Sequence, residues 1–419
     1  MEYCIEDYTS YKLHMIKTKK FKTINVKAIF SSKVIKEEIT YKNFLGDILV
    51  HSSKNYKTRK ELSTVLQDLY AMNIFSNCYR IGNLYNMEIN ASFLNERYTE
   101  KGMLEDSIKL FKEIILNPNI EDNKFDTKAF SYIRNITYNQ IESLKEDTRK
   151  LSLIKMLEKM GKKEAFSYHG YGYIEDLQNI TEENLLEFYN KTINTNKIDI
   201  IIIGDIDFNV IKRIVEDNFK FKTLKHEMSD YIIYHDKFRK TSRKIIEEAK
   251  ISQSKLSIGC KLEKLNDYER NYVLPIYSMI LGGGSDSKLF RNVREKNSLC
   301  YYISASANKL DSLLFITSGI TGSNFEQVVK LIKKSIKEIS NGLFNEEDIN
   351  KSKIQYITML DEIKENPFQI LSSYYSIEIL NYDDLDTRKE KIQKVSFDDI
   401  KNISSKIHVD TIYLLKGEE

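Results

Sequence analysis

The chain has 419 residues, of which 41% are apolar and 30% are charged, a composition typical of folded globular proteins and not of disordered or fibrous ones. Its 64 Lys and Arg nearly balance its 61 Asp and Glu, so the net charge of +3 gives no electrostatic reason to expect nucleic acid or an anionic membrane as a partner. At roughly 100–200 residues per domain, the length predicts two or more domains.

The cysteines and the N-terminus predict a cytoplasmic protein. The four cysteines lie far apart and form no Cys-x-x-Cys pair, which favours buried thiols in a reducing compartment over disulfides or a zinc knuckle; they are Cys4, Cys78, Cys260 and Cys300. The first residues are acidic and include no apolar segment of the kind found in signal peptides. The longest apolar run, residues 198–203, is far too short to cross a membrane.

The first half of the chain predicts four helices and two strands. Apolar residues at helical spacing indicate helices over about 61–70, 104–116 and 126–145, and Thr181 is a suitable N-cap for a fourth helix. Residues 87–93 alternate between apolar and polar side chains, which predicts a half-buried strand. The isoleucine-rich run at 198–203 predicts a second strand that ends at Gly204.

The second half repeats this order. We expect a strand over 256–262, an amphipathic helix over 325–340 and a long helix over 349–363. Ser396 and Asp399 resemble a capping box at the start of another helix, and residues 411–415 then predict a strand that ends at Gly417. Each of these elements follows its counterpart by about 210–220 residues, which indicates an internal duplication.

The duplication predicts an α+β protein of two homologous domains, each an antiparallel-rich β-sheet with helices packed on it. We place the domains at residues 1–220 and 251–419. The segment between them, residues 221–250, is rich in Lys and Arg. It is interpreted as a solvated linker, with a basic strip that faces substrate as the alternative.

Three stretches of the sequence contain specific motifs. The first is Leu-Gly-Gly-Gly-Ser at 281–285, which runs into residues 287–290. The second is Val-Arg-Glu-Lys-Asn-Ser-Leu-Cys-Tyr at 293–301, and the third extends from residues 175–181 to the strand that ends at Gly204. Together they resemble the insulinase/processing-peptidase (pitrilysin-type) family of zinc metallopeptidases, in its bacterial branch, in which the second stretch corresponds to Arg-Glu-Lys-x-Gly-Leu-x-Tyr. The resemblance covers nearly the whole chain and implies the duplicated metalloenzyme fold that this family shares with LuxS.

The zinc motif of the active members is missing from this chain. Those members carry His-x-x-Glu-His on a helix, where two histidines bind zinc and the glutamate activates water, and a glutamate farther along provides the third ligand. The resemblance places Asn43 and Asp47 at the histidine positions, Gly46 at the general base and Gln140 at the third ligand. No two of the six histidines are four residues apart, whatever the register; they are His14, His51, His169, His226, His235 and His408. We therefore expect no metal and no cofactor in this chain.

Arg294 and Tyr301 match an arginine–tyrosine pair of the family. The resemblance implies that this pair reaches from the second domain toward the zinc site, holds the substrate backbone and stabilises the tetrahedral intermediate. A guanidinium and a phenol can both donate to a developing oxyanion. The alternative is that Arg294 forms a surface ion pair and that Tyr301 packs in a strand with Ile303 and Ala305.

Two neighbours of the pair depart from the family pattern. Ser298 stands where the family usually has Gly, and Tyr302 adjoins Tyr301, so that either tyrosine could face a cleft. The triple glycine Gly282, Gly283 and Gly284 corresponds in the family to a loop that touches substrate or partner, and a plain turn at a helix end is the alternative. It lacks the Lys-Ser/Thr that completes a phosphate-binding P-loop.

Three hypotheses for the function follow. The first is a non-catalytic subunit of a heterodimeric zinc peptidase that encloses peptides, with the zinc in a homologous subunit that carries His-x-x-Glu-His. The second is a scaffold or peptide-binding protein built on the peptidase fold, and the third is an autonomous enzyme that uses other residues. The isolated chain could also form a homodimer.

Overall fold

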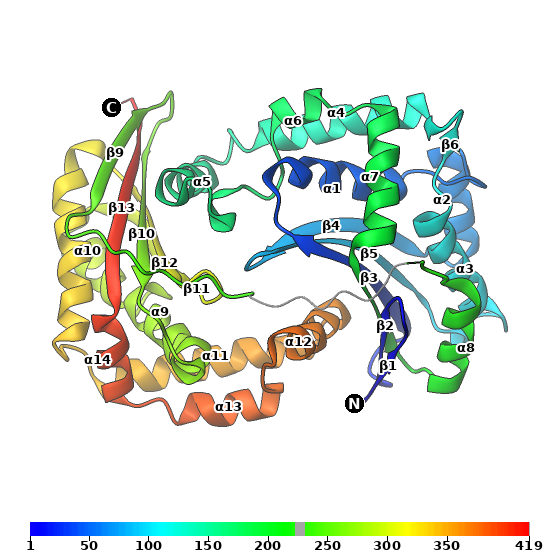
Figure 1. Ribbon diagram of the computed structural model, residues 1–419. Helices are drawn as coiled ribbons and strands as arrows, with labels where there is room; N and C mark the ends of the chain where they lie inside the picture. Colours follow the sequence, from blue (N-terminus) through cyan, green and yellow to red (C-terminus); the bar gives the residue numbers. More distant parts are fainter. Residues whose placement is uncertain (223–230, 419) are drawn as a thin grey trace. The chain divides into compact units, whose positions relative to one another are not determined.

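The structure, a computed structural model, describes residues 1–222 and 231–418 (Figure 1). Its internal contacts divide the chain into two compact units. The first comprises Met1–Glu142, the described part of Gly170–Ser229, and Asn366–Ile379. The second comprises Ser143–His169, Asp230–Glu365 and the described part of Leu380–Glu419. The domain boundaries at residues 220 and 251 follow the sequence repeat and stay a prediction, and residues 223–230 of the expected linker lie outside the described residues.

The first unit contains a six-stranded mixed sheet in the order β1-β2-β8-β3-β5-β4. Only β2 and β8 are parallel, and all other neighbours pair antiparallel. The strands are β1 (Glu2–Asp7), β2 (Lys12–Lys17), β3 (Thr23–Lys33), β4 (Asn73–Ile81), β5 (Leu84–Leu94) and β8 (Lys197–Gly204).

The second unit contains a five-stranded sheet in the order β11-β12-β10-β13-β9. Its strands are β9 (Arg243–Glu248), β10 (Ser254–Leu262), β11 (Cys300–Asn308), β12 (Leu313–Ile320) and β13 (Ile407–Lys416). β9 and β13 are parallel, and the other pairs are antiparallel, so this sheet repeats the order β2-β8-β3-β5-β4 of the first unit. The predicted α+β class with two antiparallel-rich sheets is confirmed. β9 comes from the segment that the sequence suggested as a linker.

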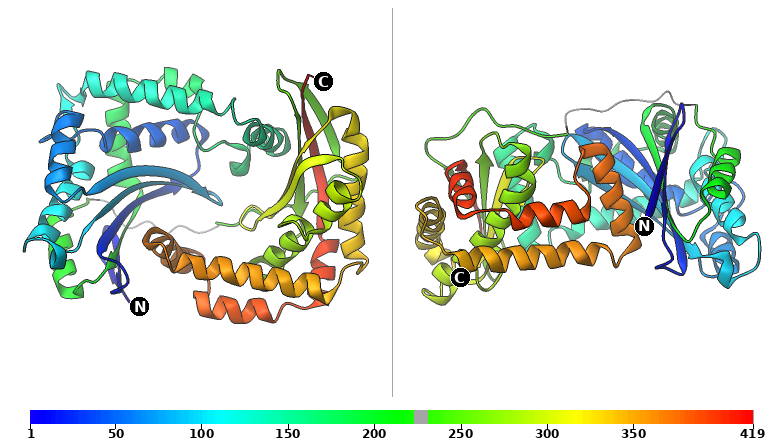
Figure 2. Two further views of the ribbon diagram at one scale, coloured as in Figure 1. Left: turned by 180° about the vertical axis from the view of Figure 1, so that it is seen from behind. Right: turned by 90° about the horizontal axis from the view of Figure 1, so that it is seen from below.

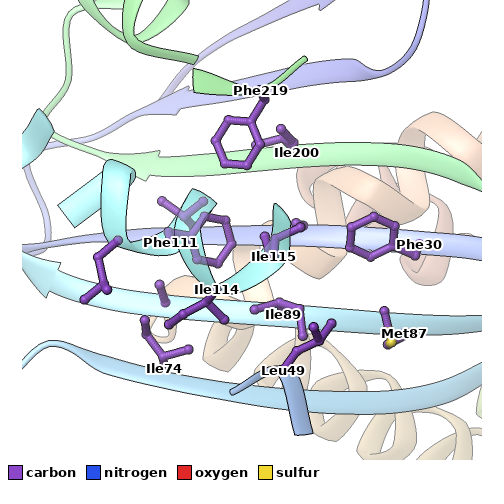
Figure 3. Packing of buried hydrophobic residues seen from close by; sticks show 14 of the residues in the cluster. Phe30, Leu49, Ile74, Met87, Ile89, Phe111, Ile114, Ile115, Ile200 and Phe219 are labelled. Atoms are coloured by element: carbon purple, nitrogen blue, oxygen red, sulfur yellow. The ribbon is translucent and has the colours of Figure 1, made fainter. Parts of the chain in front are cut away.

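In the first unit, helices bury one face of the sheet. Phe30, Ile89 and Ile200 of three strands pack against Phe111 of α3 and Leu49 of α1 (Figure 3). Apolar side chains recur at every second residue along the strands and at about every 3.6 residues along the helices. They meet in this layer, so the strands and helices share one core. The helices of this unit are α1 (Lys36–Leu49), α2 (Arg59–Asp68), α3 (Met103–Leu116), α4 (Thr127–Ser143), α6 (Ile174–Gln178), α7 (Glu182–Thr195) and α8 (Phe208–Asn218).

In the second unit, the corresponding core lies between the sheet and helices of the C-terminal half. Leu256, Ile258 and Ile316 of the sheet pack with Val328 and Ile332 of α10. The helices that follow in this half are α9 (Leu274–Gly282), α10 (Phe325–Ser340), α11 (Glu346–Ile363), α13 (Leu385–Gln393) and α14 (Phe397–Ser405).

Each sheet is covered on its other face by a helix from the opposite half of the sequence. α5 (Thr148–Gly161) places Met156 and Met160 on the second sheet, beside Tyr413, and the views in Figure 2 show it on the face opposite α10. α12 (Pro367–Leu380) packs Ile370 and Leu371 on the first sheet. The two halves of the sequence have thus exchanged one helix each.

Most predicted elements are confirmed, but one burial pattern is wrong. α10 begins and ends where the amphipathic pattern does, and α14 begins with the expected capping box of Ser396 and Asp399. The strand at 87–93 is β5, but it is not half-buried, because Glu88 and Asn90 on its polar face are also buried, on the side of the sheet that α12 covers. No helix in the described ranges is both long and apolar enough to cross a lipid bilayer.

Candidate functional site

The expected remnant of the zinc motif lies on α1. This helix begins after Ile35 with Glu37 and Glu38 in its first turn, where carboxylates interact favourably with the helix dipole. It packs along β4 and β5 at the edge of the first sheet. Asn43 and Asp47 are four residues apart and so lie on one face of the helix, with Gly46 beside them.

The Asn43 side chain is tied into its own unit. Its Nδ2 faces three oxygens: the Ile39 carbonyl at 2.8 Å, the Tyr85 hydroxyl at 2.9 Å and the Gly170 carbonyl at 2.8 Å. The Tyr85 hydroxyl donates to the same Gly170 carbonyl at 2.5 Å. This amide therefore joins α1 to β5 and to the segment before α6, a role in which the nitrogen acts as a donor and cannot bind a cation.

Gly46 and Asp47 both contact Ser76 of β4. A Cβ on Gly46 would lie 3.1 Å from the Ser76 Cβ, so a larger side chain at this position requires β4 to move. The Ser76 hydroxyl donates to Oδ1 of Asp47 at 2.6 Å. Burial raises the pKa of the Asp47 carboxyl, and the Ser76 hydrogen bond partly opposes that effect.

The fourth position, Gln140, is exposed on α4. Among the described residues, no three His, Cys, Asp or Glu side chains gather where they could hold a metal ion. An amide committed as a donor, a glycine packed on a serine, and a single carboxylate do not fit the nitrogen-rich ligand set that zinc prefers. These residues therefore do not fit zinc, and Gly46 provides no base at the position where the family's glutamate activates water.

Asp47→Asn is expected to stabilise the protein at neutral pH. Because the pKa of Asp47 is raised in the folded state, its ionised carboxylate lowers the free energy of unfolding of the wild type once the pH exceeds that pKa. The advantage of the variant should therefore shrink as the pH falls through the raised pKa, and it should be gone below about 4, where the acid is protonated in both states. Denaturant unfolding at several pH values measures it.

Asp384→Asn is the control for this pH series. Backbone N–H groups of α13, first that of Thr387, lower the pKa of Asp384, so its carboxylate stabilises the fold at neutral pH and this contribution is lost on acidification. This variant should be less stable than the wild type at neutral pH. An advantage of Asp47→Asn that grows on acidification would contradict the assignment.

Arg294 and Tyr301 flank the start of β11. Arg294 belongs to η4 (Phe290–Glu295), is exposed, and has its guanidinium 4.7 Å from the centre of the Phe290 ring. It forms no ion pair with any described residue. Tyr301 is 74% exposed, because a β-bulge between Cys300 and Tyr302 removes it from the register of β12. The structure therefore does not show the alternative, in which Arg294 forms a surface ion pair and Tyr301 packs in the strand.

Tyr302 is used by the fold of the second unit. Its ring lies under the guanidinium of Arg149 from α5, at 4.5 Å, with Lys255 of β10 at 5.8 Å. Gly319 makes room for it, since a Cβ there would approach the ring to 2.7 Å. Of the two adjacent tyrosines, Tyr301 is thus the one presented to solvent.

Ser298→Gly is expected to stabilise the protein by roughly 0.5–1 kcal/mol, since the left-handed region costs a non-glycine residue more than glycine. Ser298 has φ of 52° in the turn between η4 and β11, at the position where the family usually has Gly. Denaturant unfolding of Ser306→Gly, an exposed position inside β11, serves as the control and should lose stability. A loss of stability in both variants would contradict this explanation.

The triple glycine ends α9 against β11. A Cβ on Gly282 would lie 2.4 Å from the backbone nitrogen of Ala305, and one on Gly283 would lie 2.6 Å from Cα of Met279. Close packing therefore accounts for the first two glycines. Gly284 has open space around it and lines a small cavity of about 140 Å³ with residues of α11. Substrate contact by the triple glycine stays a prediction.

Three residues at the α1 remnant were missed by sequence reasoning. They are Ser76, Tyr85 and Gly170, which come from β4, β5 and the segment before α6. Their role depends on distant segments meeting at α1. No local pattern marks them, because each would be an ordinary residue of its strand or turn elsewhere.

Comparisons with known proteins find relatives among the M16 peptidases. Residues 179–356 match the family described as "Peptidase M16 inactive domain". The chain is similar to the "Probable inactive metalloprotease YmfF" of Bacillus subtilis, with 27% identity over 416 residues that cover 97% of this chain and 96% of that protein.

Solved structures share the fold. A conserved protein from Enterococcus faecalis has a TM-score of 0.94 at 24% identity, with 99% of each chain covered. A peptidase M16 inactive domain from Pseudomonas fluorescens has a TM-score of 0.79 at 14% identity, with 100% of this chain and 98% of that chain covered.

Proposed function

We propose that this chain, which matches the M16 peptidase family over residues 179–356, is the non-catalytic subunit of a zinc metallopeptidase assembled from two unlike chains. In this proposal the partner is a homologous subunit with the His-x-x-Glu-His motif, and it holds the zinc. The present chain is the homologue without a metal site and contributes substrate-binding surface together with Arg294 and Tyr301.

The observation that carries the proposal is that this chain exposes the arginine–tyrosine pair without using it. Tyr301 is displaced from the ladder by a bulge, a feature that often re-aims side chains at functional sites. Arg294 packs on Phe290 and leaves its guanidinium donors available to an external acceptor. A guanidinium and a phenol can together stabilise negative charge on a tetrahedral intermediate in a partner's active site.

Two strand edges support peptide capture. Within the described residues, β4 pairs only with β5, and β11 pairs only with β12, so each ends its sheet with unpaired backbone groups. An extended peptide can add to such an edge as another strand, which gives affinity without demanding a particular sequence. We propose unfolded peptides as the substrate class.

The setting we propose is the cytoplasm, with no nucleic acid and no membrane as partner. The four cysteines are free thiols, which suits a reducing compartment. A homodimer of the isolated chain is compatible with this proposal, because the productive pairing is expected to need the unlike partner.

Reconstitution tests the proposal. The chain and an M16 homologue with His-x-x-Glu-His from the same genome are purified separately and mixed, and cleavage of a quenched fluorescent peptide is followed. We expect little cleavage by either chain alone and strong cleavage by the mixture, with saturation at equal amounts. A zinc-bearing homologue that is fully active alone and unaffected by this chain would favour the scaffold hypothesis.

A further inference from the structure

Three basic side chains of the second unit act on Tyr382, which lies in the chain between α12 and α13. Lys309, in the turn after β11, has its Nζ 3.8 Å from the centre of this ring. Arg270 comes from η3 (Glu269–Val273) and Arg388 from α13. Burial, followed by the charges of Arg388 and Arg270, lowers the pKa of Lys309 to about 7. Lys309, Arg270 and Arg388 are called the basic cluster below.

The basic cluster has little negative charge of its own. The side chains of Lys309 and Arg388 form no hydrogen bond or ion pair with any residue that the structure describes. Arg270 pairs with Asp267 at 2.7 Å, but the Asp267 side chain is 90% exposed. Asp383 follows Tyr382 in the chain, and its carboxylate is already held by Lys391 at 2.6 Å and by the Tyr272 hydroxyl.

Two buried donors, one in the basic cluster and one on Tyr382, lack hydrogen-bond acceptors among the described residues. Nε of Arg270 and the hydroxyl of Tyr382 are buried, and neither has a hydrogen-bond partner in the described part of the chain. The Arg270 side chain is itself buried, with its other donors on the Leu265 carbonyl at 2.7 Å and on Tyr234. Buried donors without partners are rare in native proteins, and one reason for them is a ligand.

We propose that the basic cluster and the Tyr382 hydroxyl bind a phosphate-type oxyanion, either free phosphate or the phosphoryl group of a larger molecule. The two negative charges of a dianion would balance the positive charge of the cluster, whose one ion-pair partner among the described residues is the exposed Asp267. Its several oxygens can accept from guanidinium, ammonium and hydroxyl donors at once, a geometry in which arginine binds phosphate well. The site is independent of the proposed peptidase role, since Lys309 follows the end of β11 and Tyr301 lies near its start.

Phosphate titration of the full-length chain tests the site. Calorimetry and thermal unfolding are measured with inorganic phosphate against chloride at equal ionic strength. Phosphate should bind and raise the melting temperature of the wild type, and Lys309→Gln/Arg388→Gln should weaken binding by about 10- to 100-fold, as expected for lost charged hydrogen bonds. Tyr382→Phe keeps the ring and should weaken binding by a smaller factor.

A matched control removes the same charge elsewhere in the second unit. Lys333→Gln/Arg243→Gln changes two exposed cations and should bind phosphate as the wild type does. A parallel titration with ADP distinguishes the sources: equal affinities support free phosphate, and tighter binding of ADP supports a phosphoryl group on a larger molecule. The proposal is overturned if phosphate acts no differently from chloride, or if the cluster and control variants lose binding equally.

Discussion

Replacing Lys27 by alanine is expected to lower the free energy of unfolding by about 3–5 kcal/mol, the cost of leaving one partner of a buried ion pair uncompensated. Lys27 of β3 and Glu88 of β5 lie 2.9 Å apart beneath α12, with side-chain exposures of 4% and 3%. The Lys27 ammonium also donates to Ser372 of α12 at 2.9 Å, and the Tyr79 hydroxyl donates to Glu88 at 2.5 Å. The alanine variant would leave the Glu88 carboxylate buried without a cation.

Two controls separate charge from packing. Lys27→Met/Glu88→Gln removes both charges, keeps an acceptor for Tyr79, and should recover most of the lost stability. Lys57→Ala breaks an exposed pair with Glu121, whose side chains are 59% and 52% accessible, and should change the stability little, because solvent screens exposed pairs. Denaturant unfolding followed by circular dichroism measures all three. A Lys27→Ala variant no less stable than Lys57→Ala would contradict the account.

Arg294→Ala and Tyr301→Phe are each expected to lower the kcat of the reconstituted peptidase by about 10²–10³-fold, the usual effect of removing one oxyanion donor. The physical reason is that both donors act on charge that develops only in the transition state. The zinc content of the mixture and the association of the two chains should stay unchanged, because neither residue binds metal in this proposal. Peptide cleavage kinetics of the mixed chains measure the effect.

The structure offers a matched control for each variant. Arg291 lies on the same η4 segment but pairs with Asp348 at 2.6 Å, so Arg291→Ala should leave kcat nearly unchanged. Tyr302→Phe removes a hydroxyl that has no partner among the described residues and should also be active. Equal activity of all four variants would make the chain a scaffold and not a contributor to the active site.

Local patterns in the sequence were sufficient to predict the elements that bury a single apolar face. The helix at 325–340 was predictable because its apolar residues recur at helical spacing and reach one core. The helix predicted at 61–70 is α2, which ends earlier because Tyr70 adopts a left-handed backbone with φ of 55°.

Features that depend on the exchange of α5 and α12 could not be predicted in the same way. Polar residues such as Glu88 and Asn90 indicated a solvent-facing side of β5, but α12, almost three hundred residues away, covers that side of the sheet. The partners of Glu88, Lys27 and Tyr79, lie on other strands. The bulge at Tyr301 depends on the pairing of β11 with β12. The hydrogen bond that holds Asn43 of α1 depends on the distant Gly170 carbonyl. The loss of the zinc ligands was visible in the sequence, whereas the contacts that now occupy their positions were not.

The measurement that tests the central claim most directly is the zinc content of the purified chain, prepared without chelators or a histidine tag, before and after incubation with zinc. Elemental analysis should give close to zero zinc per chain in both samples, because Asn43, Gly46, Asp47 and Gln140 do not provide the ligands that zinc requires. About one tightly bound zinc per chain would contradict this account of the α1 remnant and would reopen the case for an autonomous metalloenzyme.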